Sequence, residues 1–212
     1  MFEDGATPEL RNIILFLENV RSLKLLGSLP RLMELELNGS NKPVLLPLLK
    51  ESAKRIAEVI LRSTMLNQVD LQVLAKKPNL QCLELLDSSY NESKLTFKKE
   101  EFLKLTLLTV DCPAINKITF TDGAVPKMEK ITWTLSRIES LSGIKNLPKL
   151  NRLQLFGDMS PIRMRLVYTH GFTQEQQKQA KRGAEEDQEK DDVRFQLSCF
   201  TSKNWCISPS SP

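Results

Sequence analysis

The sequence predicts an α/β repeat solenoid, in which a parallel sheet of about seven short strands forms one face. The main observation is a motif in which an apolar residue is followed three positions later by a second and two positions after that by a third. The motif occurs seven times, with starts 22, 24, 24, 25, 23 and 22 residues apart, in a chain that is only 41% hydrophobic. The apolar anchors are Leu10/Ile13/Leu15, Leu32/Leu35/Leu37, Ile56/Val59/Leu61, Leu80/Leu83/Leu85, Leu105/Leu108/Val110, Met128/Ile131/Trp133 and Leu150/Leu153/Leu155.

The length of the repeat is the second observation. A period of roughly 20–29 residues with the pattern L-x-x-L-x-L is typical of leucine-rich repeats, which stack strand beside strand. We therefore expect a leucine-rich-repeat horseshoe over residues 1–158, with the sheet on its concave face and an irregular or short-helical convex side. Within each unit the second and third anchors alternate with polar or variable residues, and this period of two predicts a half-buried strand.

Proline marks the point where the chain enters most of the predicted strands. It stands two residues before the first anchor in five units, and proline is disfavoured inside a strand because it lacks an N–H. The third and fifth units have Lys54 and Leu103 at this place. The five prolines are Pro8, Pro30, Pro78, Pro126 and Pro148.

The segments that connect successive strands differ in character. Apolar residues recur at helical intervals between Leu46 and Leu61, so we expect a short helix there, and residues 68–75 also favour a helix. Residues 88–93 are a loop by composition. The sequence Thr-Asp-Gly-Ala at 121–124 is a turn signal before the next strand.

Both ends of the chain depart from the repeat. Nine residues precede Leu10, too few for a polar cap helix, so we expect either further protein before Met1 or a minimal cap formed by residues 2–9. The period stops after Asp158, and no eighth strand is expected. Residues 159–212 are predicted to be a divergent polar tail, with a solvated helix or disorder over 173–192 and a more apolar stretch over 193–207 that has the composition to fold back onto the last repeat.

Composition and motifs exclude several classes of function. The net charge of +4 comes without a basic run, and 6% aromatic residues are too few for base stacking, so nucleic acid is not an expected partner. We find neither an apolar run long enough to span a membrane nor a secretory signal, and we expect a cytoplasmic protein. The spacing of Cys82, Cys112, Cys199 and Cys206 and the presence of one histidine favour reduced thiols over a zinc site. We expect no cofactor.

Several units resemble the leucine-rich repeats of plant intracellular immune receptors. The likeness is carried by residues 29–37 (LPRLMELEL) and 147–155 (LPKLNRLQL). Residues 78–85 (PNLQCLEL), 95–97 (LTF), 102–105 (FLKL) and 110–112 (VDC) are similar to the C-terminal repeats of cereal coiled-coil receptors that carry a nucleotide-binding switch domain. Residues 123–131 and 140–148 continue the resemblance, which covers residues 8–158.

The resemblance implies a sensor. The repeats of such receptors contact pathogen effectors or guarded host proteins, and they hold the switch domain inactive until then. This chain contains no G-x-x-x-x-G-K-[ST] phosphate loop, so the switch domain is not part of it. Its tail beyond Asp158 also differs from the usual ending of the family.

The residues two, four and six positions after each first anchor are predicted to form the binding surface. Acidic side chains gather in the first four units and basic ones in the last two, and such a charge gradient steers and orients a partner of opposite gradient. The alternative is that exposed strand residues are simply polar. The candidate protein-binding residues are Glu34, Glu36, Glu58, Ile60, Arg62, Glu84, Leu86, Leu107, Lys130, Thr132, Arg152 and Gln154.

Apolar residues on the same face are further candidate contacts. Phe16, Leu86, Leu107 and Phe156 are candidate contacts, although capping explains Phe16 and Phe156 better because they lie on terminal units. Trp133 occupies an inward position and is expected in the core. His170 and Cys112 belong to no nucleophile motif, so we predict no catalytic residue and no enzyme.

The sequence therefore predicts the protein-recognition module of an intracellular plant immune receptor, acting in the defence response. Its expected partners are a pathogen effector, a guarded host protein, or its own or another nucleotide-binding switch domain. The alternative is a stand-alone leucine-rich-repeat scaffold or adaptor without an immune role. A Glu34→Lys, Glu36→Lys double variant is expected to weaken partner binding while thermal stability stays nearly unchanged.

Overall fold

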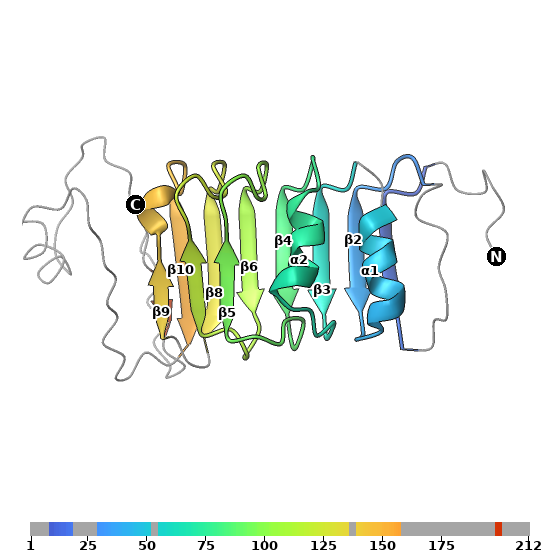
Figure 1. The fold of residues 1–212 in the computed structure, drawn as a ribbon, viewed down its shortest axis with the longest axis horizontal. Helices are drawn as coiled ribbons and strands as arrows, with labels where there is room; N and C mark the ends of the chain where they lie inside the picture. Colours follow the sequence, from blue (N-terminus) through green and yellow to red (C-terminus); the bar gives the residue numbers. More distant parts are fainter. Residues whose placement is uncertain (1–8, 19–28, 52–54, 136–138, 158–197, 201–212) are drawn as a thin grey trace, which may run out of the picture.

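The computed structural model describes residues 9–18, 29–51, 55–135, 139–157 and 198–200. In this part of the chain, eight parallel strands form one open sheet in the order β1-β2-β3-β4-β6-β8-β10-β11 (Figure 1). This α/β arrangement is consistent with a repeat solenoid. The strands are β1 (Asn12–Phe16), β2 (Glu34–Asn38), β3 (Glu58–Arg62), β4 (Cys82–Leu86), β6 (Leu107–Asp111), β8 (Lys130–Leu135), β10 (Arg152–Gly157) and β11 (Ser198–Phe200).

The first seven strands of the large sheet keep the spacing of the sequence repeat. Each begins two residues after the first anchor of its unit, and neighbouring strands pair at equivalent residues, as Asn12 does with Glu34 and Glu34 with Glu58. The seven parallel strands predicted from the apolar triplets are confirmed. Because every strand pairs in the same register, equivalent residues of successive units lie side by side in the sheet.

The apolar anchors form the core. All anchors of the second to seventh units are at most 2% exposed, and Trp133 is fully buried as predicted. Burying a side chain of this size stabilises the fold by about 1.5–3 kcal/mol before chain entropy is subtracted. The anchors of the first unit, Leu10, Ile13 and Leu15, are only partly buried.

A second layer covers one face of the large sheet (Figure 1). It contains α1 (Lys42–Glu51), α2 (Gln68–Ala75), the 3-10 helix η2 (Ile144–Asn146) and a three-stranded parallel sheet of β5 (Lys94–Phe97), β7 (Lys117–Phe120) and β9 (Ser140–Ser142). The prediction of an irregular or short-helical layer is met by α1 and α2. It did not include the second sheet.

Alternating apolar residues explain the second sheet. Leu95 and Phe97 on β5, and Ile118 and Phe120 on β7, point inward and are at most 1% exposed. The rings of Phe97 and Phe120 stack with centroids 5.0 Å apart, which couples neighbouring units through aromatic contact. The phenylalanine at each strand end therefore extends the core beneath the second sheet.

The two helices test the predictions for the connecting segments. The structure has α2 at the expected residues 68–75. The short helix expected within residues 46–61 is α1, which covers the first part of that stretch but begins earlier, at Lys42, and ends at Glu51; the chain is extended in β3 from Glu58. The loop over 88–93 and the turn at 121–124 lie outside the named strands, as predicted.

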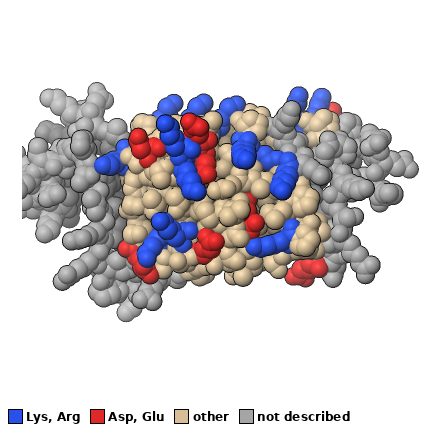
Figure 2. All heavy atoms as spheres, viewed as in Figure 1, with Lys and Arg blue, Asp and Glu red and all other residues tan. Residues whose placement is uncertain are grey.

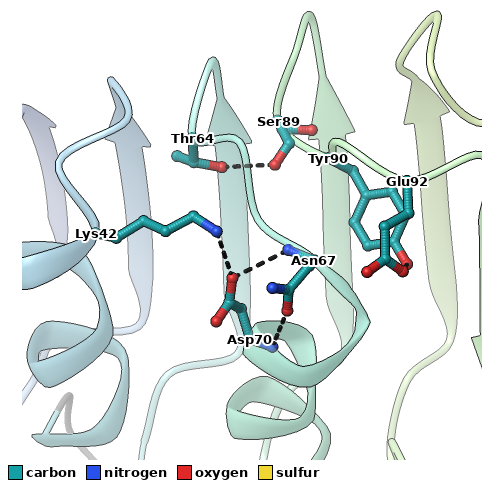
Figure 3. A network of polar contacts seen from close by, with 7 residues as sticks. All are labelled: Lys42, Thr64, Asn67, Asp70, Ser89, Tyr90 and Glu92. Carbon is teal, nitrogen blue, oxygen red and sulfur yellow. Dashed lines mark hydrogen bonds and ion pairs between the residues drawn. The ribbon is translucent and has the colours of Figure 1, made fainter.

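Polar contacts at the start of α2 join three units (Figure 3). The Asn67 side chain accepts a hydrogen bond from the Asp70 N–H at 2.9 Å, and the Asp70 carboxylate accepts one from the Asn67 N–H at 3.1 Å. The Lys42 ammonium lies 2.9 Å from the same carboxylate and so ties α1 to α2. The Thr64 hydroxyl donates to the Ser89 carbonyl at 2.9 Å and links the next unit.

Gly143 shows why one position at the end of β9 requires glycine. Its φ is +78°, in the left-handed region that favours glycine. A Cβ added there would lie 1.8 Å from the carbonyl oxygen of Phe120, so a side chain has no space.

The sheet continues beyond the last repeat, and the expectation that no eighth strand exists is wrong. Strand β11 pairs in parallel with β10, with Gln154 opposite Ser198 and Phe156 opposite Phe200. Any extended segment can bond to an open strand edge, because backbone groups make the bonds and no repeat pattern is needed. The predicted return of residues 193–207 is met at 198–200, while the helix or disorder expected over 173–192 lies outside the described residues.

Candidate functional site

The candidate site is the face of the large sheet opposite α1, α2 and the second sheet, which we call the open face. Because side chains alternate across a strand, inward anchors direct the residues between them to the open face. In-register pairing aligns these residues in rows across the strands. The first row is Asn12, Glu34, Glu58, Cys82, Leu107, Lys130 and Arg152, and the second is Ile14, Glu36, Ile60, Glu84, Thr109, Thr132 and Gln154.

Carboxylates gather on β2, β3 and β4 in an acidic zone, which we define by Glu34, Glu36, Glu58 and Glu84. Glu36 forms an ion pair with Arg62, whose Nε lies 2.8 Å from the Glu36 carboxylate. The other three carboxylates form no ion pair with any residue of the described part. The acidic zone therefore carries excess negative charge at neutral pH.

The pKa of Glu58 is affected by the neighbouring carboxylates of the acidic zone. Burial raises it above its ordinary value, and the negative charges of Glu34 and Glu84 raise it further. A hydrogen bond with the Cys82 thiol acts in the opposite direction. A cation brought to this place would relieve the repulsion, since an opposite charge favours the ionised carboxylate.

Cys82 lies within the acidic zone and is a free thiol. Burial, followed by the charges of Glu58 and Glu84, raises its pKa to about 12. Ligand atoms of Glu58, Cys82 and Glu84 lie within 4.8 Å of one another, a spacing that could hold a metal ion. The thiol stays protonated at neutral pH, however, and a metal binds the thiolate, so this set is poorly prepared for a soft metal.

The other end of the open face is basic. Lys130 on β8 lies directly opposite Arg152 on β10 in the first row. Beside them in the second row, the Thr132 hydroxyl donates a hydrogen bond to the Gln154 side-chain oxygen at 3.3 Å. Leu107 lies between the acidic and basic ends and is half-buried. From Glu34 to Arg152, the first row therefore runs from negative through neutral to positive.

Charges on the covered face are arranged differently. Figure 2 shows Lys and Arg side chains next to Asp and Glu side chains over the helices and the second sheet. Lys42 is 2.9 Å from Asp70, and Lys117 is 2.7 Å from Glu139. These two ion pairs join oppositely charged residues of neighbouring units, whereas the first row of the open face has acidic residues near one end and basic residues at the other.

The apolar candidates have different environments. Ile60 and Leu107 are half-buried on the open face, whereas Leu86 is only 9% exposed and offers little surface for a contact. Phe16 is 70% exposed, so the expected capping contact does not cover it. Phe156, at the other end, is half-buried on β10.

Of the two reactive residues considered from sequence, the structure describes only Cys112, which is buried. The Cys112 thiol is 1% exposed and donates to the Tyr90 carbonyl oxygen at 3.3 Å, as a packed structural cysteine does. His170 lies outside the described residues.

Sequence reasoning missed one member of the charged surface. The missed residue is Asp87, in the turn after β4, whose carboxylate lies 3.7 Å from the Arg62 guanidinium. Arg62 therefore contacts two carboxylates, those of Glu36 and Asp87. The turn residues 87–88 could have indicated an acidic side chain beside the strand end. The burial of Cys82 between Glu58 and Glu84 has no such signal, because it depends on the pairing of β3 with β4.

The open face thus brings the predicted charged residues into one aligned surface. None of the described helices has the length and apolar character needed to cross a membrane. No protein-family model matches the chain, and neither a curated protein nor a solved structure matches it significantly.

Proposed function

We propose that the chain is a leucine-rich-repeat horseshoe whose open face recognises another protein. The observation that carries the proposal is the segregation of charge along the first row, from Glu34 and Glu58 at one end to Lys130 and Arg152 at the other. Like charges side by side on neighbouring strands are unfavourable without a partner. Their arrangement therefore favours a role in binding over a role in stability.

The spacing of the strands gives the distance between the charged groups that a partner needs. The acidic and basic pairs are about four strands apart, or roughly 19 Å at about 4.8 Å per strand. A partner that fits carries a basic and an acidic group at this separation, which about six residues of extended chain span. Such complementarity increases the association rate and fixes orientation.

The biological setting we infer is a cytoplasmic plant immune receptor. The support for this setting is the resemblance of residues 8–158 to the repeats of cereal receptors. In that setting the partner is a pathogen effector, a guarded host protein, or a nucleotide-binding switch domain that the repeats hold inactive. No cofactor is required for this activity.

The proposal is tested by capture of partners from leaf extract with the tagged full chain. The variant is Glu34→Lys with Glu58→Lys, because Glu36 is already paired with Arg62. Reversing two charges replaces attraction with repulsion, and we expect capture of specific partners to fall about tenfold. Quantitative mass spectrometry measures the fall, and added salt should reduce wild-type capture as well.

The matched control is Glu100→Lys with Asp122→Lys, two exposed acidic residues away from the open face. It makes the same change in net charge and should capture partners as the wild type does. Equal capture by all three proteins would contradict recognition by the open face. Recovery of an effector, a guarded protein or a switch domain supports the immune setting, and recovery of only signalling or ubiquitin-transfer proteins favours a scaffold.

A further inference from the structure

Basic side chains recur immediately before the first anchor of the repeat. This position is basic in five of the seven units, whereas it holds Glu9 in the first unit and Asn79 in the fourth. Successive units place the position 22 to 25 residues apart, so the basic residues form no run in the sequence. The five residues are Arg31, Arg55, Lys104, Lys127 and Lys149.

The fold aligns these five residues along one end of the large sheet, in a row that we call the basic rim. The strands pair in register, so equivalent residues of successive units lie side by side. Two contacts within the row show this directly: Lys104 Nζ lies 2.8 Å from Asn79 Oδ1, and Arg31 forms an ion pair with Glu9. All five basic residues are exposed, and Figure 2 shows cationic side chains in a row along the upper edge of the molecule.

Most of the charge on the basic rim is unpaired in the described part of the chain. With the exception of Arg31, its residues form no ion pair with any described residue. Neighbouring strands are about 4.8 Å apart, so Lys104, Lys127 and Lys149 bring three like charges within roughly 10 Å. Like charges side by side repel each other, and an anionic occupant offsets this repulsion.

The surroundings of the basic rim favour a narrow anionic chain. Exposed carboxylates border the row on both sides, because Glu129 lies between Lys127 and β8 and Asp122 lies between β7 and Lys127. A flat layer of anionic lipid headgroups would meet these carboxylates together with the lysines. Phe102, the aromatic residue nearest to the row in sequence, is 3% exposed and offers no surface on which nucleic-acid bases could stack. An acidic peptide therefore fits the row best.

The chain itself contains such a peptide at a short distance from the basic rim. Residues 185–192 read Glu-Glu-Asp-Gln-Glu-Lys-Asp-Asp, with six carboxylates and one cation, and we call them the acidic segment. Strand β11 is parallel to β10, with Ser198 opposite Gln154, so the chain enters β11 from the end of the sheet that carries the basic rim. Asp192 precedes Ser198 by six positions, and six residues of extended chain reach about 20 Å. This reach covers the lysines of the last three units, which lie about 5, 10 and 14 Å from β11 at about 4.8 Å per strand.

We propose that the basic rim binds the acidic segment of the same chain. Eight extended residues span about 27 Å, and the row from Arg55 to Lys149 spans four strand spacings, or about 19 Å, so one segment can contact all four unpaired cations. A short covalent connection gives an effective concentration in the millimolar range, so several ion pairs that are individually weak are sufficient. This surface is separate from the open face and does not depend on the function proposed for it.

Zero-length crosslinking of the full chain tests the contact. A carbodiimide joins a carboxylate directly to an amine, and mass spectrometry of the digested product locates the bond. We expect links from the acidic segment to Lys104, Lys127 and Lys149, and none to Lys94, which is exposed at the start of β5 at the opposite end of the large sheet. In a dilute mixture of chains labelled with ¹⁴N and ¹⁵N, each link should join peptides that carry the same isotope.

A charge reversal on the basic rim provides a second test. Cleavage by a glutamate-specific protease measures how accessible the acidic segment is. Lys127→Glu replaces an attraction with a repulsion, and we expect cleavage within the segment to become about fivefold faster. Lys127→Arg keeps the charge and should retain the wild-type rate. The matched control, Lys94→Glu, makes the same change in net charge away from the row and should leave the rate unchanged.

A labelled peptide of seven glutamates distinguishes the chain's own segment from a separate partner. Replacing the six carboxylates of the acidic segment by amides frees the basic rim, so the affinity of the full chain for this peptide should rise at least about fivefold. Unchanged affinity would overturn the proposal and leave the rim to another protein. The replaced residues are Glu185, Glu186, Asp187, Glu189, Asp191 and Asp192.

Three further outcomes would overturn the proposal. Links spread evenly over all exposed lysines would show that the basic rim has no preference for the acidic segment. Links between peptides of different isotopes would make a second copy of this chain the occupant. Equal cleavage rates in Lys127→Glu and Lys94→Glu would show that the row does not hold the segment.

Discussion

At the scale of single residues, the acidic zone shows how neighbouring strands create an environment that no local sequence contains. Glu34 and Glu58 are 24 positions apart in sequence and directly opposite each other in the sheet. Glu84 lies on the next strand, one row away from Glu58. The charges that raise the pKa of Glu58 therefore come from the repeat units on either side of its own. Sequence phasing predicted that these carboxylates share a face, but only the structure identified Arg62 as the partner of Glu36.

Replacing Glu58 tests this repulsion. Because its pKa in the folded chain is raised, the folded state favours protonated Glu58, and this contribution to stability is lost as pH rises through the folded-state pKa. Glu58→Gln keeps a neutral side chain at every pH. We therefore expect the variant to have a larger free energy of unfolding than the wild type at pH 7, measured by urea denaturation, and the difference to shrink below pH 4.5.

The comparison variant is Glu129→Gln, which removes an exposed carboxylate outside the acidic zone. It should have little effect at either pH. A gain for Glu58→Gln that is the same at low and neutral pH would rule out charge repulsion as its cause.

At the scale of elements, the connecting segments depend on different forces. Helix α2 is encoded locally, because Asn67 and Asp70 form a capping box at its N-terminus. The second sheet is encoded by tertiary context, because β5, β7 and β9 are only three or four residues long and pair with segments 23 positions away. Strands this short have a weak sequence signal. Their alternation of apolar and polar residues covers only three or four positions within segments that have the composition of loops.

The capping box predicts a measurable loss in α2. Asn67→Ala removes the side-chain oxygen that accepts the Asp70 N–H, and we expect the free energy of unfolding to fall by about 1 kcal/mol. Chemical denaturation measures the loss. Val69→Ala, at a 69% exposed position of the same helix, controls for side-chain truncation and should cost little. Equal losses in the two variants would contradict the role of the cap.

At the scale of the whole molecule, the fold is a row of units that contact only their neighbours in the large sheet. Stability in such an array is a sum of unit and junction terms, so a terminal unit can open while the centre remains folded. The first unit has one junction in the described part and incompletely buried anchors, whereas the fourth unit has a junction on each side. The two should respond differently to the same substitution.

Leucine-to-alanine substitutions test this difference. Leu83→Ala, in the fully buried fourth unit, should lower the free energy of global unfolding by about 2–5 kcal/mol. Leu15→Ala should have a smaller effect on global unfolding and should speed hydrogen exchange in β1 without affecting β6. Leu103→Ala, at a 53% exposed position, should be nearly neutral. A uniform rise in exchange across all strands in Leu15→Ala would indicate a single cooperative unit instead.

The order of residues was enough to predict the number and phase of the first seven strands, the buried anchors of the second to seventh units, and the face that carries the charged residues. These properties follow from a period of two within strands and a period of 22 to 25 between them, and both are visible in the order of residues. Helix α2 was also predictable, since its cap lies within four residues.

The order of residues did not predict the second sheet, the eighth strand, the burial of Leu86 or the raised pKa values of Glu58 and Cys82. Each of these depends on groups that are brought together by pairing between distant segments. Backbone hydrogen bonds make that pairing without requiring a particular side chain, as at β11.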